Sequence, residues 1–146
     1  MPIVNMLETN SNHIRTILPW VSVGVALHIL HQSPRIPALV VTSESGRVIG
    51  SVSEGNIVAG LAAHGANLVS MSVEEVMSQR TPTCSPRDSL FSVVRTMTAA
   101  DHQHLLVVRD AELIGVVSLL DVVRARLTEM ELESATVRDT VLSHKW

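Results

Sequence analysis

The chain has 146 residues, of which 46% are hydrophobic, and its 11 lysines and arginines against 14 aspartates and glutamates give a formal net charge of −3. A chain of this length buries a core without disulfides or metals. Its mild acidity and its 2% of aromatic residues argue against nucleic-acid binding, which needs a positive surface and often stacking platforms. Apolar runs reach only four residues, as at 38–41, far short of the roughly 20 that span a bilayer. We therefore expect neither nucleic acid nor a membrane as a partner.

Two features indicate a cytoplasmic protein. The first ten residues, MPIVNMLETN, include an acid and no lysine or arginine, unlike a signal peptide. The single cysteine, Cys84, cannot form an internal disulfide, which fits a reducing compartment. We therefore expect a cytoplasmic location.

The first half of the chain predicts a short extended segment, a helix, two strands and a second helix. Apolar residues at helical spacing predict the helix over 22–30. The apolar run 38–41 predicts a buried strand, and the polar turn 43–46 leads to a second strand that ends at Val52. Ser53 is a good N-cap for the helix that follows.

The same order of elements recurs in the second half, mostly at an offset of 67 residues. The aligned segments are 16–26 with 83–93, 38–41 with 105–108 and, after a turn shortened by two residues, 48–53 with 113–118. This repeat predicts a helix over 89–99, a tight hairpin turn over 109–111 and a second N-cap at Ser118.

An internal repeat of this kind predicts an α+β, sandwich-like fold. Each half of about 60 residues is marginal alone, so we expect two βαββα units packed sheet to sheet with pseudo-twofold symmetry. The expected divisions are a first repeat with its N-terminal segment over 1–66, a connector over 67–80, a second repeat over 81–127 and a C-terminal helical extension over 128–146. A short helix is expected in the connector from Ser72 to Ser78.

The repeated pattern resembles a tandem pair of cystathionine β-synthase (CBS) domains, also called a Bateman module, of the small stand-alone bacterial type. The matching residues are 19–26, 36–41 and 46–56 in the first half and 76–77, 84–86, 104–108 and 113–121 in the second. The resemblance covers about residues 14 to 127, and its strength lies in the whole pattern occurring twice in the same order.

The resemblance implies regulation by an adenosine nucleotide such as AMP, ADP, ATP or NAD, with or without magnesium and with no obligatory cofactor. It implies nucleotide contacts in clefts between the repeats. The residues implied for the first site are Thr16, Ile17, Pro37, Ser53 and Asn56, and those implied for the second are Thr83, His104, Ser118 and Asp121. The occupancy of these sites would be passed to a regulated protein of unknown identity.

Physical chemistry supports the assignment of Ser118 and Asp121. A helix N-terminus presents unpaired N–H groups and the positive end of the helix dipole, which favour an anion. A carboxylate that accepts from ribose hydroxyls and a hydroxyl near phosphate suit a ribose phosphate. The alternative is that Ser118 caps the helix and Asp121 is an acid favoured by the dipole, and the two roles do not exclude each other.

The first half departs from the family pattern where a nucleotide would bind. Asn56 stands where the pattern has an aspartate, and Gly55 stands where close relatives carry an arginine. Because hydrogen bonds to a charged group are stronger than neutral ones, we expect a weaker or empty first site. In the second half, Gln103 replaces a frequent arginine and Leu106 a frequent proline.

Other polar residues offer alternatives to nucleotide binding. His102 with His104, and His28 with His31, are spaced for shared metal ligation, but no third ligand is evident, and we predict no metal site. Cys84 has no cationic partner in the sequence and is predicted to be a buried, inert thiol. No nucleophile or phosphate-loop motif is present, so we expect no enzyme activity.

The C-terminal stretch carries a regular apolar stripe. Val123, Leu127, Met130, Val137 and Val141 keep a spacing of three and four, interrupted at Ser134, while charged residues fill the other faces. The stripe predicts either packing on the chain's own domain or a homodimer contact across a twofold axis. The stretch from Ile3 to Leu7 is a second candidate for crossing the interface between repeats.

Three functions follow from these observations. The leading one is a homodimeric nucleotide sensor, and the second is a structural adaptor whose sites hold no ligand. The third is a small metal-dependent enzyme that uses the histidine pairs.

Overall fold

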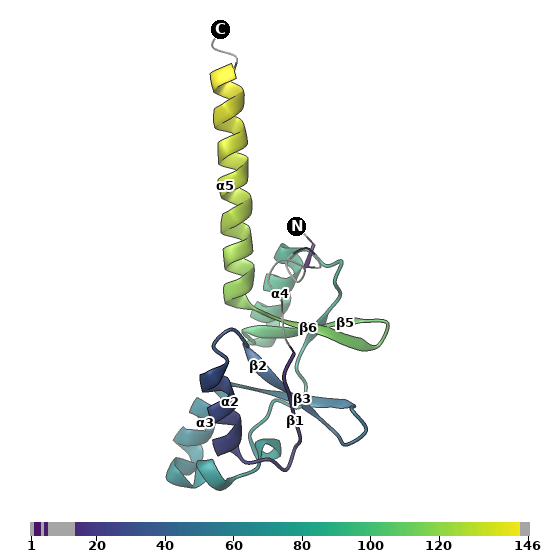
Figure 1. The fold of residues 1–146 in the computed structure, drawn as a ribbon, viewed down its shortest axis with the longest axis vertical. Helices are drawn as coiled ribbons and strands as arrows, with labels where there is room; N and C mark the ends of the chain where they lie inside the picture. The colour runs from purple at the N-terminus through teal and green to yellow at the C-terminus, as the bar shows by residue number, and fades with distance from the viewer. Residues whose placement is uncertain (1, 4, 6–13, 144–146) are drawn as a thin grey trace.

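The computed structural model describes residues 2, 3, 5 and 14–143, and of residues 136–143 it describes the backbone alone. Two three-stranded sheets lie one above the other, with α2 (Val23–Gln32) and α3 (Glu54–His64) on the lower sheet and α4 (Leu90–Ala100) on the upper one (Figure 1). The last helix, α5 (Leu119–Ser143), leaves the upper sheet and extends away from the body (Figure 1).

The two sheets have the same topology. In the first, β1 (Thr16–Ile17) pairs parallel with β2 (Ala38–Thr42), which pairs antiparallel with β3 (Val48–Ser53). In the second sheet, the corresponding strands are β4 (Thr83–Cys84), β5 (His104–Arg109) and β6 (Glu112–Ser118). A register shift occurs at the equivalent place in each hairpin, between Val41 and Thr42 and between Val107 and Val108. The expected order of elements, the α+β class and the pseudo-twofold repeat are confirmed.

The alternation of side chains along the strands builds three layers of core. Leu39 and Val41 on β2 face the helices of the first repeat, and Leu105 and Val107 on β5 face those of the second. Residues of the opposite parity meet in the layer between the sheets, where Val40, Leu106 and Val116 form a buried cluster. The expected packing of sheet on sheet is therefore confirmed.

The sequence alignment of the central strands was wrong by one residue. Ala38 pairs with Ser53 in the first sheet, whereas His104, and not Leu105, pairs with Ser118 in the second. The strand 38–41 therefore corresponds to 104–107, because the segment between helix and strand is one residue shorter in the second repeat. Apolar runs alone cannot fix such a register when both faces of the strand are buried.

Helix boundaries agree with the expected ranges within one or two residues. Ser22 and Ser89 cap α2 and α4 by accepting from the N–H groups of Val25 and Ser92. The connector holds two 3₁₀ helices, Gly65–Ser70 and Val73–Glu75, in place of the single short helix expected from Ser72 to Ser78. Its end pairs with an edge strand, because Ser78 exchanges two backbone hydrogen bonds with Ser51 of β3.

The hairpin turns differ in length as expected. Gly46 has a φ of 87° in the longer turn. In the tighter one, Asp110 and Ala111 have φ values of 49° and 66°, the left-handed conformation that two-residue hairpin turns require. These turns place the tips of both hairpins at the same end of the molecule (Figure 1).

Ile3, close to the N-terminus, packs against the second repeat. The backbone N–H of Ile3 donates to the carbonyl of Asp88 at 2.9 Å, and the Ile3 side chain is fully buried in the second-repeat core beside Leu90 and Val93. The segment from Ile3 to Leu7 was a candidate for such a crossing, and of it the structure describes residues 3 and 5.

Candidate functional site

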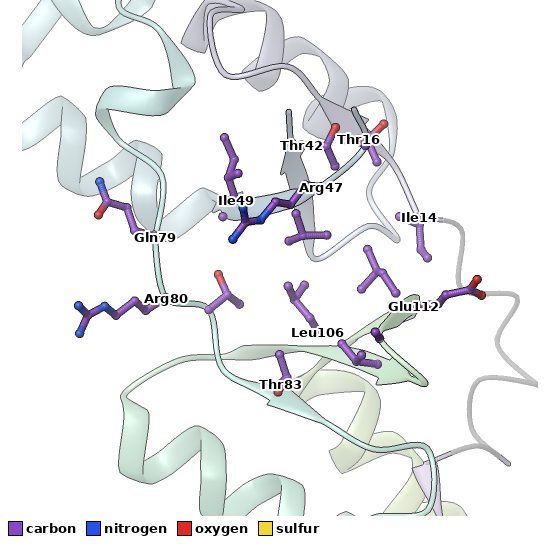
Figure 2. Close-up of a pocket in the computed structure, with 17 residues that line it drawn as sticks. Ile14, Thr16, Thr42, Arg47, Ile49, Gln79, Arg80, Thr83, Leu106 and Glu112 are labelled. Atoms are coloured by element: carbon purple, nitrogen blue, oxygen red, sulfur yellow. The ribbon is translucent and has the colours of Figure 1, made fainter. Parts of the chain in front are cut away.

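A cavity of about 770 Å³ lies between the two sheets, at the end where both hairpins turn (Figure 2). Pockets of this size accommodate small molecules and cofactors. Its lining residues are Ile14, Thr16, Thr42, Gly46, Arg47, Val48, Ile49, Gly50, Gln79, Arg80, Thr81, Thr83, Leu106, Val108, Ala111, Glu112 and Leu113. Both repeats and the connector therefore contribute to one cavity.

Polar and aliphatic side chains share the lining of the cavity. Thr16 and Thr83, which begin β1 and β4, occupy equivalent positions in the two repeats and line it from opposite sheets (Figure 2). Arg47 extends across the opening toward Gln79, whereas the Glu112 carboxylate points outward and Arg80 points away from the centre (Figure 2). Among these charged groups, the Arg47 guanidinium is the one placed to attract an anion.

A buried polar network lies beside this cavity, between the sheets. His104 on β5 is 4% exposed, and its Nε2 lies 3.0 Å from the Oγ of Ser51 on β3. The Ser51 hydroxyl also forms a short hydrogen bond with the hydroxyl of Thr81 in the connector. Burial, together with the neighbouring His102, lowers the pKa of His104 from 6.5 to about 4, so the imidazole is neutral at pH 7.

The comparisons with known proteins agree with this architecture. The profile of the CBS domain matches residues 73–128. A crystal structure of a CBS-domain containing protein from Agrobacterium tumefaciens is 30% identical, covers 86% of this chain and 92% of its own, and superposes with a TM-score of 0.81. The chain belongs to the CBS-domain family.

Two further proteins that this chain resembles have names that mention adenosine compounds. The human 5'-AMP-activated protein kinase subunit gamma-3 is 36% identical over 98 residues, which is 62% of this chain and 20% of that protein. This chain thus spans about a fifth of the length of that curated relative. A CBS domain pair in complex with 5'-methylthioadenosine and S-adenosyl-L-methionine shares the fold, with a TM-score of 0.73 at 22% identity over 86% of this chain and 98% of its own.

The second CBS repeat holds Ser118 and Asp121 in a reciprocal capping box at the start of α5. The Ser118 backbone N–H donates to the Asp121 carboxylate at 3.1 Å, and the Asp121 N–H donates to the Ser118 hydroxyl at 3.0 Å. Both side chains are half-buried and lie outside the lining of the cavity. The pair therefore caps the helix, and its contact with a nucleotide stays a prediction.

The first CBS repeat engages its equivalent pair in a different way. Asn56 accepts from the Ser53 N–H at 2.9 Å and from the Ser53 hydroxyl at 3.0 Å, and its amide group donates to the hydroxyl of Ser78 at 3.1 Å. Because Asn56 carries a donor that aspartate lacks, it ties the start of α3 to the connector. Pro37 precedes β2 at this same end of the sheet, opposite the hairpin tip.

The structure thus brings together only part of the expected site. Of the nine residues implied by the family pattern, Thr16 and Thr83 line the described cavity, Ile17 is buried in the first-repeat core, and His104 lies in the polar network. Sequence reasoning missed Arg47, Gln79 and Thr81. The position of Arg47 directly after Gly46 in a hairpin turn is the one signal that pointed to it, since turn residues often carry function.

Cys84 lies in a buried environment. Cys84 is buried, and burial together with the nearby Asp88 raises the pKa of its thiol to about 12, so the expectation of a buried thiol is confirmed. Within the described part of the chain, no group of three His, Cys, Asp or Glu side chains is placed to hold a metal ion. The rings of His102 and His104 meet edge to face with centroids 5.7 Å apart.

Within the same described ranges, no helix combines the length and the apolar character needed to cross a membrane.

Proposed function

We propose that this chain is a regulatory CBS pair that binds a phosphate-bearing adenosine nucleotide in the cavity between its two sheets. The observation that carries the proposal is that Thr16, Thr83 and Arg47 all line one cavity of about 770 Å³. The aliphatic lining, which includes Leu106 and Leu113, suits the face of a base, and the two hydroxyls suit a ribose.

The charge of the cavity favours one group of adenosine compounds. The Arg47 guanidinium attracts phosphate through charge-assisted hydrogen bonds. AMP, ADP, ATP and NAD carry phosphate, whereas S-adenosylmethionine carries a positive sulfonium that Arg47 repels. We therefore propose AMP, ADP, ATP or NAD as the ligand, and a regulatory role in the cytoplasm with no catalysis of its own.

The direct test is a thermal-shift screen followed by calorimetric titration. A ligand that binds only the native state stabilises it by about 2.7 kcal/mol at a hundredfold excess over its dissociation constant. The panel is AMP, ADP, ATP, NAD and S-adenosylmethionine, each with and without magnesium, with GMP as the base control. A shift with a phosphate-bearing adenosine compound supports the proposal, and no shift with any compound overturns it.

A second candidate is a structural adaptor that holds no nucleotide. The observation that favours it is that Ser118, Asp121 and His104 already have hydrogen-bond partners within the chain. The adaptor predicts an unchanged melting temperature with every nucleotide in the panel, so the same screen separates the two functions.

We also propose that the chain forms a homodimer through α5, independently of any ligand.

A further inference from the structure

Helix α5 is much longer than the surface on which it packs. Its 25 residues span about 37 Å at the usual rise per residue. Val122 and Ala125 in its first turns are buried in the second-repeat core, and the rest of the helix extends beyond the body (Figure 1). Helices in proteins gain most of their stability from packing of an apolar face, so this extension needs a partner.

A second face of α5 is apolar and exposed. Leu120, Val123, Leu127 and Met130 are 57%, 44%, 53% and 50% exposed, so this stripe does not pack on the chain's own domain. At 100° per residue, the stripe is centred roughly 120° around the helix from the face that carries Val122. A partner on this face therefore meets the helix without displacing the body.

The spacing of the stripe is that of a coiled coil. Counting Leu120 as position a of a heptad places Val123 and Met130 at d and Leu127 at a. The sequence continues the same alternation of three and four residues through Ser134 at a, Val137 at d and Val141 at a. A period of 3.5 residues over three heptads is the pattern by which helices pair along a left-handed seam.

The charges that flank the stripe suit a second copy of the same helix. Arg126 falls at position g and Glu131 at the e position five residues later, which meet across the seam of a parallel pair. By sequence, Glu133 at g and Arg138 at e repeat the match with the signs exchanged. An identical parallel helix thus offers opposite charges at both places.

An antiparallel pair of the same helices matches these charges in one register and not in the next. With Leu127 opposite Met130, Arg124 faces Glu131 and Arg126 faces Glu133, whereas Leu127 opposite Val137 sets Glu131 against its own copy. The parallel pair matches its charges with every a and d position in register, and crosslinking separates the two directions.

The ion pairs within one chain are compatible with such a partner. The Arg126 Nη1 lies 2.9 Å from the Glu129 carboxylate and 3.9 Å from that of Glu133, with the Arg126 side chain 54% exposed. A guanidinium has five donors, so Arg126 can keep these contacts and still reach a carboxylate across the seam.

We propose that α5 forms a parallel coiled coil with α5 of a second copy of this chain. Leu120, Val123, Leu127 and Met130 form the seam, and Arg126 of each copy pairs with Glu131 of the other. The proposal is independent of nucleotide binding.

The first test is the mass of the full chain in solution, measured by analytical ultracentrifugation over a range of concentrations. The parent chain should associate, Leu127→Asp should be monomeric, and the matched control Thr128→Asp, one residue away and off the stripe, should associate as the parent does. A monomeric parent, or an associated Leu127→Asp, overturns the proposal.

A charge exchange keeps the test valid if Leu127→Asp fails to fold. Arg126→Glu places glutamates on both sides of the seam, and we expect a dissociation constant raised about tenfold, which corresponds to about 1.4 kcal/mol. The double variant Arg126→Glu with Glu131→Arg restores opposite charges and should recover the parent value. Failure of the double variant to recover association overturns the pairing of these two positions.

Direction is tested by crosslinking. Leu127→Cys and Ser134→Cys, made separately, both place a thiol at an a position. In a parallel pair each faces its own copy, so both variants should form disulfide-linked dimers under mild oxidation, while the parent, whose Cys84 is buried, should not. Crosslinking of one variant alone or of neither overturns the parallel arrangement.

Discussion

The Nε2 of His104 lies 3.0 Å from the Oγ of Ser51, and this contact joins β5 of one sheet to β3 of the other. It is a polar link in a layer otherwise formed by Val40, Leu106 and Val116. A buried hydrogen bond contributes about 1 kcal/mol, but an unpaired buried group costs about 1 to 3 kcal/mol. The packing of the two repeats is therefore sensitive to the protonation of one imidazole.

The pH dependence of stability should reveal this imidazole. The unfolded chain binds the proton near pH 6.5 and the folded chain only near pH 4, so stability is fully present above pH 6.5 and is lost as pH falls toward 4. The loss amounts to about 3 kcal/mol over this range. Urea unfolding between pH 4 and 7 should show a shallower decline in His104→Gln than in the parent. The control His31→Gln, at an exposed position, should lose stability with falling pH as the parent does. If His104→Gln also declined as steeply as the parent, the low pKa of His104 would be contradicted.

Arg47→Gln should weaken the binding of phosphate-bearing ligands. Removing a charge-assisted hydrogen bond costs about 1.5 to 3 kcal/mol. Calorimetric titration should show this loss for AMP, while Arg87→Gln, an exposed arginine outside the cavity, should bind as the parent does. Unchanged affinity in Arg47→Gln would remove Arg47 from the site.

Asp121→Ala separates capping from binding. Loss of the capping acceptor should lower the free energy of unfolding by about 1 kcal/mol. If Asp121 also holds a ribose, the affinity for an adenosine nucleotide falls by about 1 to 3 kcal/mol. Asp121→Asn keeps an acceptor for the Ser118 N–H and loses the charge. Measured binding that stays unchanged in both variants would leave Asp121 with the cap alone.

Gly50 is predicted to tolerate no side chain. A Cβ at this position in β3 would lie 2.5 Å from the carbonyl oxygen of Ser78 and 2.9 Å from the Met77 sulfur. Gly50→Ala should therefore destabilise the fold by about 1 to 3 kcal/mol. Gly55→Ala is the matched control, since its Cβ would meet only the Ser53 hydroxyl at 3.6 Å, and in a helix it should stabilise by a few tenths to about 1 kcal/mol. Chemical denaturation of the two variants should show changes of opposite sign.

Cys84 should react only when the chain opens. Because its thiol is buried and its pKa is raised to about 12, little thiolate exists at neutral pH. Ellman's reagent should label it slowly in buffer and rapidly in urea, whereas the thiol of Thr128→Cys, on an exposed position off the apolar stripe, should react at once. Rapid labelling of the parent chain in buffer would contradict the burial of Cys84.

The sequence predicted the fold well because its signals are local and occur twice. Each local signal is weak alone, whether it is a capping serine such as Ser22 or Ser89, an apolar run or a turn residue. Their repetition in one order determines the elements and the class of fold. The register of β5 was missed by one residue because four apolar residues in a row fit either parity when both faces are buried.

The site was predicted only in part, because a cavity depends on how two units meet. Thr16 and Thr83 were found through the repeat, yet they were assigned to separate sites, and the structure brings them to one cavity. Arg47 and Thr81 lie in a turn and a connector, where sequence periodicity carries no information. The partner of His104 is 53 residues away on the other sheet, so no local pattern could reveal it.

The link between His104 and Ser51 also makes the two repeats non-interchangeable. By strand register, the positions equivalent to His104, Ser51 and Thr81 in the opposite repeat are Ala38, Val116 and Ile14, all apolar. A chain built from two first repeats would set Ser51 against alanine and isoleucine and bury its hydroxyl without an acceptor. A chain built from two second repeats would likewise leave the buried imidazole among aliphatic groups, without its hydrogen-bond partner. Each half is therefore the specific complement of the other and a poor match for itself.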